Sequence, residues 1–259
     1  TIDANDLDYV DGVRRALTPS GIQVVIPVMT SSAPLIELRS LVRSGSLGGV
    51  VLMDVAQGDE REAMLLDEEI PTVLIGSSGR AVGAPGVDTD FVQMAHASVE
   101  HLAGLGHRRI IALMRETAYD DAHARQDQAH ELLRAAGDLG VDVLVRQVPE
   151  AALAGAGIVG AGGLIEGCSA VLSNNPVAVV GLSCAAQAHG LSVPADLSVL
   201  TLGITQDSGR QGEAFSELSV DREAMGAEAG SLLLARLRGE PDPAQHRRLM
   251  PAVLTDRGS

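Results

Sequence analysis

Short apolar runs alternate along this chain with longer amphipathic stretches, and this alternation constrains the fold more than any other feature. The runs with the composition of buried strands lie at residues 22–28, 49–53, 72–75, 109–114, 141–145, 170–173 and 198–202. Helical periodicity fills the segments between them, at residues 6–18, 34–44, 59–69, 91–105, 122–137, 150–166, 176–189 and 222–238. Short strands that alternate with such helices are typical of βαβ units. We therefore predict an α/β fold, with doubly wound parallel sheets that carry helices on both faces.

Several predicted helices carry the expected capping residues. Asn175 precedes Pro176, which is the pattern of a helix N-cap followed by proline at the first helical position. Gly190 and Gly239 stand where a C-cap glycine belongs. The first helix, near residues 6–17, has almost no strand before it. A parallel sheet that begins in this way lacks a strand that is ordinarily central, so we expect that the natural chain is longer or that this strand is missing here.

The size of the chain suits one large or two medium domains, because 259 residues with a hydrophobic fraction of 46% can bury a sizeable core. No apolar run approaches the roughly 20 residues that span a bilayer. The first residues, TIDANDLDYVDG, resemble no secretory signal. Cys168 and Cys184 lack the spacing of a metal site or a redox pair, which favours reduced thiols. We expect a cytoplasmic protein with no membrane contact.

The balance of charge bears on nucleic-acid binding. Thirty-four acidic residues against nineteen basic ones give a formal net charge of −15, and every basic residue is an arginine. The phosphate backbone of DNA repels such a surface. Any contact with DNA must therefore come from a segment outside this chain.

Motifs for enzyme chemistry are weak. The run GAGIVG at residues 155–160 formally matches the dinucleotide fingerprint, but a helical pattern precedes it and no acidic residue follows at the required distance. Close packing of helices through small residues explains it better. The histidines have no metal-ligand spacing, and the serines lack the nucleophile-elbow pattern. Acidic pairs such as Asp120 and Asp121, or Asp88 and Asp90, fit helix starts. We expect no enzymatic activity, no cofactor and no metal.

A different set of motifs follows a fixed order along the chain. The longest are VEHLAGLGHRRII at 99–111, GLSVPADLSVLTL at 190–202 and DREAMGAEAGSLLLARLRG at 221–239. Between and around them stand GGVVLM at 48–53, IPTVLIG at 70–76, PGVDTD at 85–90, SNNPVAVVG at 173–181 and the final MPAVLTDRGS. Together they resemble the regulatory domain of the lac-repressor/gal-repressor (LacI/GalR) family of transcription factors. The resemblance covers essentially the whole chain.

This resemblance implies two periplasmic-binding-protein-like α/β lobes joined by three crossovers, near residues 87–89, 219–221 and 250–252. The N-terminal lobe would comprise residues 1–88 completed by 221–250, and the C-terminal lobe 89–220 completed by 251–259. It also implies a small-molecule effector in the cleft between the lobes, a homodimer, and allosteric control of an N-terminal helix-turn-helix that this chain does not contain. The expected dimer helices are those at 35–42 and 222–238, unless both simply pack on their own sheets.

The sequence departs from the family's sugar sensors at most of their polar anchors. Gly76 stands where an Asp is common, Asp127 where an Arg is common, and Gly203 where a strand ends in Asp. Asn175 is retained, and Arg125 is a possible substitute for the lost arginine. We therefore expect an effector other than an ordinary neutral hexose or pentose bound in the usual way. Because Asp127 reverses the local charge, an anionic effector is also disfavoured. Two outcomes stay open: a more apolar or cationic ligand that uses Asp127, Asn175 and Asp207, or a cleft that has lost effector control.

Loops at the predicted carboxyl ends of the strands provide the candidate effector-binding residues. Each of them could instead be a helix cap or a solvated loop residue. The candidates are Asn5, Asp6, Ser77, Phe91, Arg125, Asp127, Asn175 and Asp207. The main alternative function is the periplasmic substrate-binding protein of an ABC-type uptake system, which shares the fold. The missing signal peptide, the Gly-His-Arg-Arg turn and the Val-Pro-Ala-Asp-Leu-Ser stretch favour the regulator.

Overall fold

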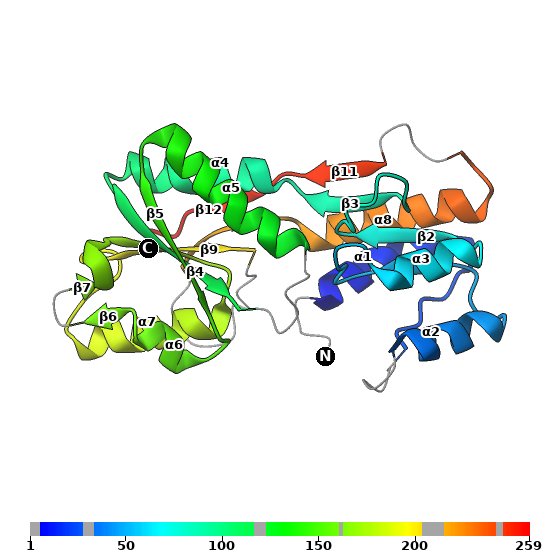
Figure 1. The fold of residues 1–259 in the computed structure, drawn as a ribbon, viewed down its shortest axis with the longest axis horizontal. Helices are drawn as coiled ribbons and strands as arrows, with labels where there is room; N and C mark the ends of the chain where they lie inside the picture. Colours follow the sequence, from blue (N-terminus) through cyan, green and yellow to red (C-terminus); the bar gives the residue numbers. More distant parts are fainter. Residues whose placement is uncertain (1–5, 28–33, 117–122, 161–162, 204–214, 242–245) are drawn as a thin grey trace. The chain divides into compact units, whose positions relative to one another are not determined.

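The structure is a computed structural model that describes residues 6–27, 34–116, 123–160, 163–203, 215–241 and 246–259 (Figure 1). These residues form two compact units. The first consists mainly of Thr1–Thr89 and Asp221–Met250, and the second mainly of Asp90–Asp120, Arg125–Val220 and Pro251–Ser259. No helix among the described residues is long and apolar enough to cross a membrane.

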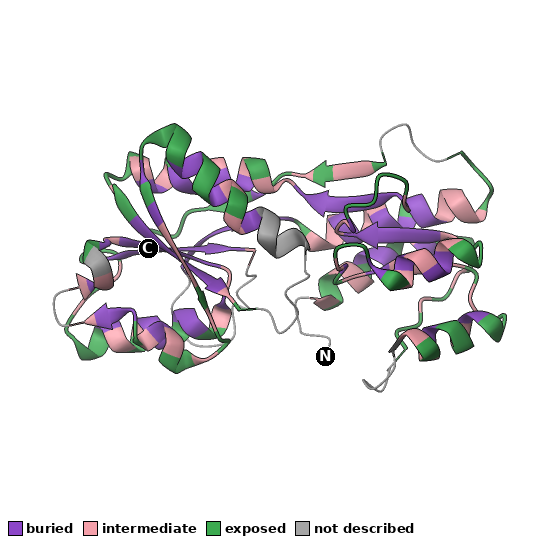
Figure 2. Ribbon diagram, in the orientation of Figure 1, coloured by how far each residue is buried: buried purple, intermediate pink, exposed green. Residues whose placement is uncertain are grey.

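The first unit contains a four-stranded parallel sheet in the order β1-β2-β3-β11. Its strands are β1 (Val50–Leu52), β2 (Thr72–Ile75), β3 (Gly86–Thr89) and β11 (Arg247–Met250). Its helices are α1 (Asp6–Leu17), α2 (Pro34–Arg43), α3 (Glu60–Asp67) and α8 (Arg222–Leu237), and a 3-10 turn, Thr18–Ser20, follows α1. Every residue of β2 and β3 is buried, as Figure 2 shows.

The strand expected at residues 22–28 is not present in its described part. Residues 22–27 have no strand conformation, and the side chain of Val25 is 73% exposed; residue 28 lies outside the described residues. A strand needs a hydrogen-bonded neighbour. The strand that would ordinarily be central has no counterpart among the described residues, so this run has no neighbour beside it. The expectation of a strand at residues 22–28 was therefore wrong for its described part, residues 22–27.

Helices α1 and α8 of the first unit pack closely against each other. A Cβ added at Gly226 of α8 would lie 2.0 Å from the carbonyl oxygen of Tyr9 on α1, and one at Gly12 would lie 2.1 Å from that of Glu223. The two helices therefore touch backbone to backbone. This approach buries Met225, which is 2% exposed.

The apolar side chains of α8 and α2 are mostly used within the first unit. On α8, Leu232 and Leu233 are buried and Leu234 is half-buried. On α2, Leu38 and Val42 belong to a core cluster with residues of α3, β1 and β2. Met225, Leu232 and Leu233 are thus buried within the chain, while the dimer contact expected of this helix stays a prediction. Ile36 on α2 remains 71% exposed.

The second unit contains a six-stranded sheet in the order β12-β10-β9-β8-β4-β5. Only β12 is antiparallel to its neighbour. Its strands are β4 (Arg109–Arg115), β5 (Asp142–Val148), β8 (Ala170–Ser173), β9 (Ser198–Leu202), β10 (Ser216–Ser219) and β12 (Val253–Thr255). Its helices are α4 (Phe91–Gly104), α5 (His123–Leu139), α6 (Ala152–Ala156) and α7 (Pro176–Ala188).

Helices cover both faces of this sheet. Figure 1 shows α4 and α5 on one side and α6 and α7 on the other. Side chains on one face of the sheet, such as Ile111, Leu113 and Val171, share a core cluster with Val179 and Leu182 of α7. The predicted α/β class with mostly parallel sheets is confirmed.

The helix predicted at residues 150–166 is much shorter in the structure. It ends at Ala156, and a small hairpin follows, with β6 (Val159–Gly160), β7 (Gly163–Leu164) and a 3-10 turn at Ile165–Gly167. Gly163 has a φ of 112°, which a helix does not allow. The GAGIVG run does serve close packing, because a Cβ at Gly155 would lie 1.7 Å from the carbonyl oxygen of Ala178 on α7.

The Gly-His-Arg-Arg turn joins the amino ends of three strands. Its His107 lies with Nδ1 2.7 Å from the Ser169 hydroxyl and Nε2 3.1 Å from the Ser198 hydroxyl. Burial, and secondarily the charge of His101, lowers the pKa of the His107 imidazole below its ordinary value. A neutral ring suits this position between two hydroxyl groups. The motif therefore has a structural role at the edge opposite the strand carboxyl ends.

The contact between α1 and α8 predicts a cost for one added methyl group. We expect Gly226→Ala to lower the free energy of unfolding by at least about 2 kcal/mol, because backbone atoms on both helices must move apart. Gly137→Ala on α5 is the matched control, since nothing lies within 4 Å of a Cβ there. Alanine favours a helix, so the control should be unchanged or stabilised by up to about 1 kcal/mol. Chemical denaturation followed by circular dichroism measures both, and equal effects would contradict the prediction.

Candidate functional site

The carboxyl ends of the parallel strands form one edge in each unit. Ligands of open α/β sheets bind at this edge, because the loops that follow the strands converge there. In the first unit the loops after β1, β2 and β3 form the edge, and in the second unit the loops after β4, β5, β8 and β9 form it.

A ring and a guanidinium meet at the edge of the first unit. The guanidinium carbon of Arg222, the first residue of α8, lies 5.8 Å from the ring centroid of Tyr9 on α1, which is a cation–π distance. Burial raises the pKa of the Tyr9 phenol above its ordinary value, although the charge and hydrogen bond of Arg222 oppose the rise. Asp6 and Asp88 act on the same phenol. The candidate Asp6 thus lies in a charged cluster at the start of α1.

Asp88 holds two strands of the first unit together. Its carboxylate accepts hydrogen bonds from Arg247 Nε at 3.0 Å and Nη2 at 2.5 Å, and from the backbone N–H of Thr89 at 2.8 Å. Asp88 is only 3% exposed. The ion pair joins β3 to β11 and keeps a buried charge neutralised.

Two further candidates occupy the positions expected from the sequence but have local partners. Ser77 follows β2, and its hydroxyl accepts a hydrogen bond from the N–H of Gly79 at 3.2 Å. Gly76 before it has a φ of 109°, so an aspartate at that position would be strained. Phe91 is half-buried and opens α4, which Asp90 caps by accepting a hydrogen bond from the N–H of Gln93 at 2.9 Å.

Asn175 is fully buried at the edge of the second unit. Its Oδ1 accepts a hydrogen bond from the N–H of Ala178 and so caps α7, at 3.1 Å. Its Nδ2 donates to the carbonyl oxygens of Val148 and Pro149, at 3.3 and 3.1 Å. With an exposed fraction of 0%, the amide ties α7 to the loop after β5. In this geometry it positions the edge, and its predicted contact with an effector stays a prediction.

The neighbouring Asn174 is partly exposed and belongs to a second network. Its Oδ1 accepts a hydrogen bond from the backbone N–H of Arg115 at 2.7 Å, and its Nδ2 donates to Oε1 of Gln128 at 2.8 Å. The Arg115 guanidinium lies 3.6 Å from the carboxylate of Glu150, which follows β5. The loops after β4, β5 and β8 thus bring a guanidinium, a carboxylate and two amides together.

The sequence-based candidates are only partly described. Asn5 and Asp207 lie outside the described residues, as do the side chains of Arg125 and Asp127 on α5. Sequence reasoning missed several polar residues at the two edges, namely Tyr9, Arg115, Gln128, Asn174 and Arg222. Arg115 could have been found, because it directly ends the apolar run of β4. Gln128 and Arg222 carried no such signal, since each lies within a helix.

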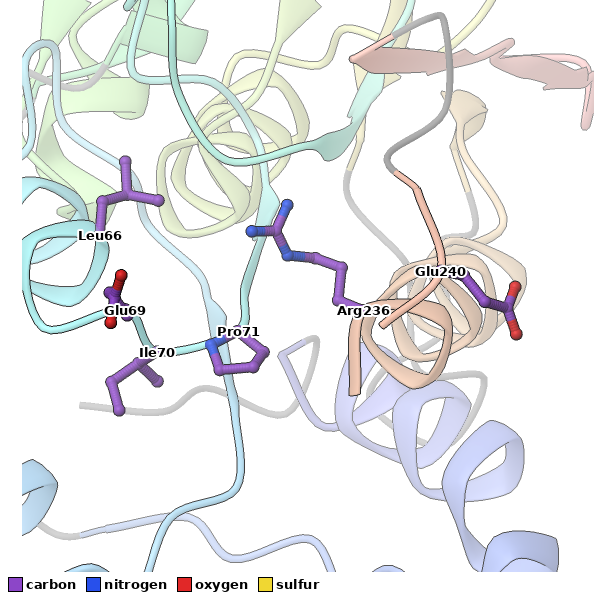
Figure 3. Close-up of a pocket in the computed structure, with 6 residues that line it drawn as sticks. All are labelled: Leu66, Glu69, Ile70, Pro71, Arg236 and Glu240. Carbon is purple, nitrogen blue, oxygen red and sulfur yellow. The ribbon is translucent and has the colours of Figure 1, made fainter. Parts of the chain in front are cut away.

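One surface hollow lies away from both edges. It has a volume of about 430 Å³ and is found beside the amino end of β2. Figure 3 shows Leu66 and Ile70 pointing away from each other, so they form no continuous apolar floor. Its lining residues are Leu66, Glu69, Ile70, Pro71, Arg236 and Glu240. Among the described residues, no cluster of His, Cys, Asp and Glu is arranged to hold a metal ion.

Two α/β units with mostly parallel sheets are the architecture of a periplasmic-binding-protein-like domain. The sequence profile of the periplasmic binding protein-like domain matches residues 99–259, and the chain belongs to this family. The periplasmic-binding-protein-like domain that the LacI/GalR resemblance implies is confirmed by this match.

Among these relatives is an uncharacterised HTH-type transcriptional regulator in the aml 5′ region of Streptomyces limosus. It is 29% identical over 174 residues, which are 63% of this chain and 49% of that protein. The HTH-type transcriptional regulator MalR of Streptomyces coelicolor is 23% identical over 256 residues, which are 95% of this chain and 74% of that protein. The chain thus spans about half the length of the first relative.

A solved structure with the same fold is that of a LacI family transcriptional regulator from Bifidobacterium animalis subsp. lactis. It superposes with a TM-score of 0.86 at 18% identity, over 99% of this chain and 94% of that one. At this identity the likeness concerns the fold.

The geometry of Asn175 predicts a structural effect of its removal. We expect Asn175→Ala to lower the free energy of unfolding by about 2–3 kcal/mol, because a helix cap and two buried amide hydrogen bonds are lost. Asn175→Ser is the matched control, since serine restores the cap and should recover roughly half of the loss. Denaturation curves distinguish the two. An alanine variant as stable as the parent would show that the amide has no structural role.

Proposed function

We propose that this chain is the effector-binding and dimerisation part of a bacterial transcription regulator of the LacI family, acting as a repressor. The observation that carries the proposal is the similarity to MalR, an HTH-type transcriptional regulator, along 95% of this chain. The polar groups at the strand ends of each unit support effector binding. Operator DNA would be contacted by a helix-turn-helix outside this chain, in the cytoplasm.

Control of DNA binding needs an effector that distinguishes two conformations. A ligand shifts an equilibrium only by the difference of its affinities for the two states. The polar strand ends supply the contacts on which such a difference can depend. The chain passes from one unit to the other after Thr89, Val220 and Met250.

The effector is proposed to be something other than an ordinary neutral hexose or pentose bound in the family's usual way. The positive φ of Gly76 supports this, because glycine adopts that conformation readily whereas an aspartate there would be strained. The alternative function, a periplasmic substrate-binding protein of an ABC-type uptake system, is less well supported, because the relatives are HTH-type regulators. These relatives are not enzymes, and we propose no catalytic activity.

Specific DNA binding tests the regulator directly. This chain carries a net charge of −15, so we expect it to give no sequence-dependent retardation of duplex DNA in a low-salt mobility-shift experiment. The full product of the gene should retard its own upstream region under the same conditions. Sequence-specific retardation of DNA by this chain alone would contradict the expectation that it binds no DNA. A full product that is exported and binds no DNA would favour the uptake protein.

Self-association tests the dimer. We expect sedimentation equilibrium at micromolar concentration to give twice the chain mass of 26.8 kDa. Ile36→Glu should weaken the dimer, because it places a charge on the exposed apolar residue of α2. Val82→Glu is the matched control, since Val82 is 90% exposed outside the proposed dimer helices. A purely monomeric parent chain, or equal effects of both variants, would contradict the assignment.

A further inference from the structure

One guanidinium at the carboxyl edge of the second unit has a buried hydrogen-bond donor without a partner among the described residues. The Arg115 side chain is only 24% exposed, and its Nε–H is buried without a hydrogen-bond partner. The nearest described carboxylate, on Glu150, is 3.6 Å away and therefore beyond hydrogen-bond distance. Buried donors are nearly always paired, because an unpaired one loses its water without replacement. This donor therefore calls for an acceptor.

The polar side chains around Arg115 bond to groups other than its Nε–H. The side chain of Asn174 is held between the Arg115 backbone N–H and Gln128 Oε1, at 2.7 and 2.8 Å. Gln128 is itself buried, and its Nε2 faces the sulfur of Met94 at 3.4 Å. These amides satisfy one another and fix the edge. Asn175 is likewise committed to backbone groups.

We propose that Arg115 is the residue by which this unit selects its effector, and that the effector carries an oxyanion, either a carboxylate or a phosphate. The proposal rests on the proposed function and names the chemistry of its ligand. A guanidinium presents parallel N–H groups that match the two oxygens of such a group. The sequence-based expectation against an anionic effector considered Asp127 alone and did not include Arg115.

Glu150 supports this chemistry in the unbound protein. Its carboxylate is 44% exposed and lies beside the guanidinium without a hydrogen bond, so little holds it there. An incoming oxyanion can take the inner position while Glu150 turns toward water. The loose ion pair then limits the charge of the empty site.

Titration calorimetry at constant ionic strength tests the proposal, with succinate and inorganic phosphate as anionic probes and glucose and maltose as neutral ones. We expect an anion to bind the parent chain, and Arg115→Gln to weaken that binding at least about tenfold, which is the effect of losing a charged hydrogen bond. Arg109→Gln is the matched control. It removes the same charge at the opposite end of β4, where Arg109 pairs with Asp142 at 2.9 Å, and it should leave anion binding unchanged.

A second variant distinguishes phosphate binding from carboxylate binding. It also shows whether a loss of binding comes from misfolding. Arg115→Lys keeps the positive charge but loses the parallel N–H groups of the guanidinium. It should therefore retain phosphate binding and lose most succinate binding. The proposal is overturned if neither anion binds the parent chain, or if Arg115→Gln and Arg109→Gln weaken binding equally. Binding of glucose or maltose in that case would leave the effector-binding function standing without an anion. Specific DNA binding by the full gene product tests the regulator independently of either result.

Discussion

Parallel pairing of the strands is the constraint on which the site depends. A parallel register places the carboxyl ends of all the strands on the same edge of a sheet. Loops that are far apart in the sequence therefore lie close together in space. In the second unit this brings the ends of β4, β5 and β8 together, with Leu113 opposite Ser173 and Arg115 opposite Val148. The polar groups of Arg115, Glu150 and Asn174 meet because of this register. A site of this kind is therefore a consequence of the topology before any single residue is considered.

The helices can cover these sheets closely because small residues stand where they cross. In both units the contact is backbone to backbone, at Gly226 against Tyr9 and at Gly155 against Ala178. The first of these contacts also sets the position of the Tyr9 ring beside Arg222. Packing in the core and polarity at the edge are thus linked, since a shift of α8 against α1 would separate the ring from the guanidinium.

The sequence predicted the fold class well, because period and composition report burial directly. The strands at 72–75, 170–173 and 198–202 have the bounds that the structure gives. The sequence-based prediction failed where the structure depends on strand pairing. Residues 22–27 are an apolar run, but they form no strand because no neighbouring strand pairs with them. The prediction also failed where glycine residues end a helix. After Ala156 the sequence still has a helical pattern, but the structure has a hairpin.

The site was harder to predict than the fold, because a polar residue's role depends on which of its atoms are already bonded. Asn174 and Asn175 are adjacent and chemically identical, yet Asn175 is fully committed to backbone groups, whereas Asn174 is partly exposed and bonds to the Arg115 backbone N–H and to Gln128. The sequence marks Asn175 as a helix cap through the Pro176 that follows it, but it gives no sign of the network that Asn174 joins. What distinguishes them is direction, since successive residues after a strand point to different sides. The inward residue becomes a cap, and the outward residue joins Arg115, whose unpaired donor then determines what chemistry this edge can accept.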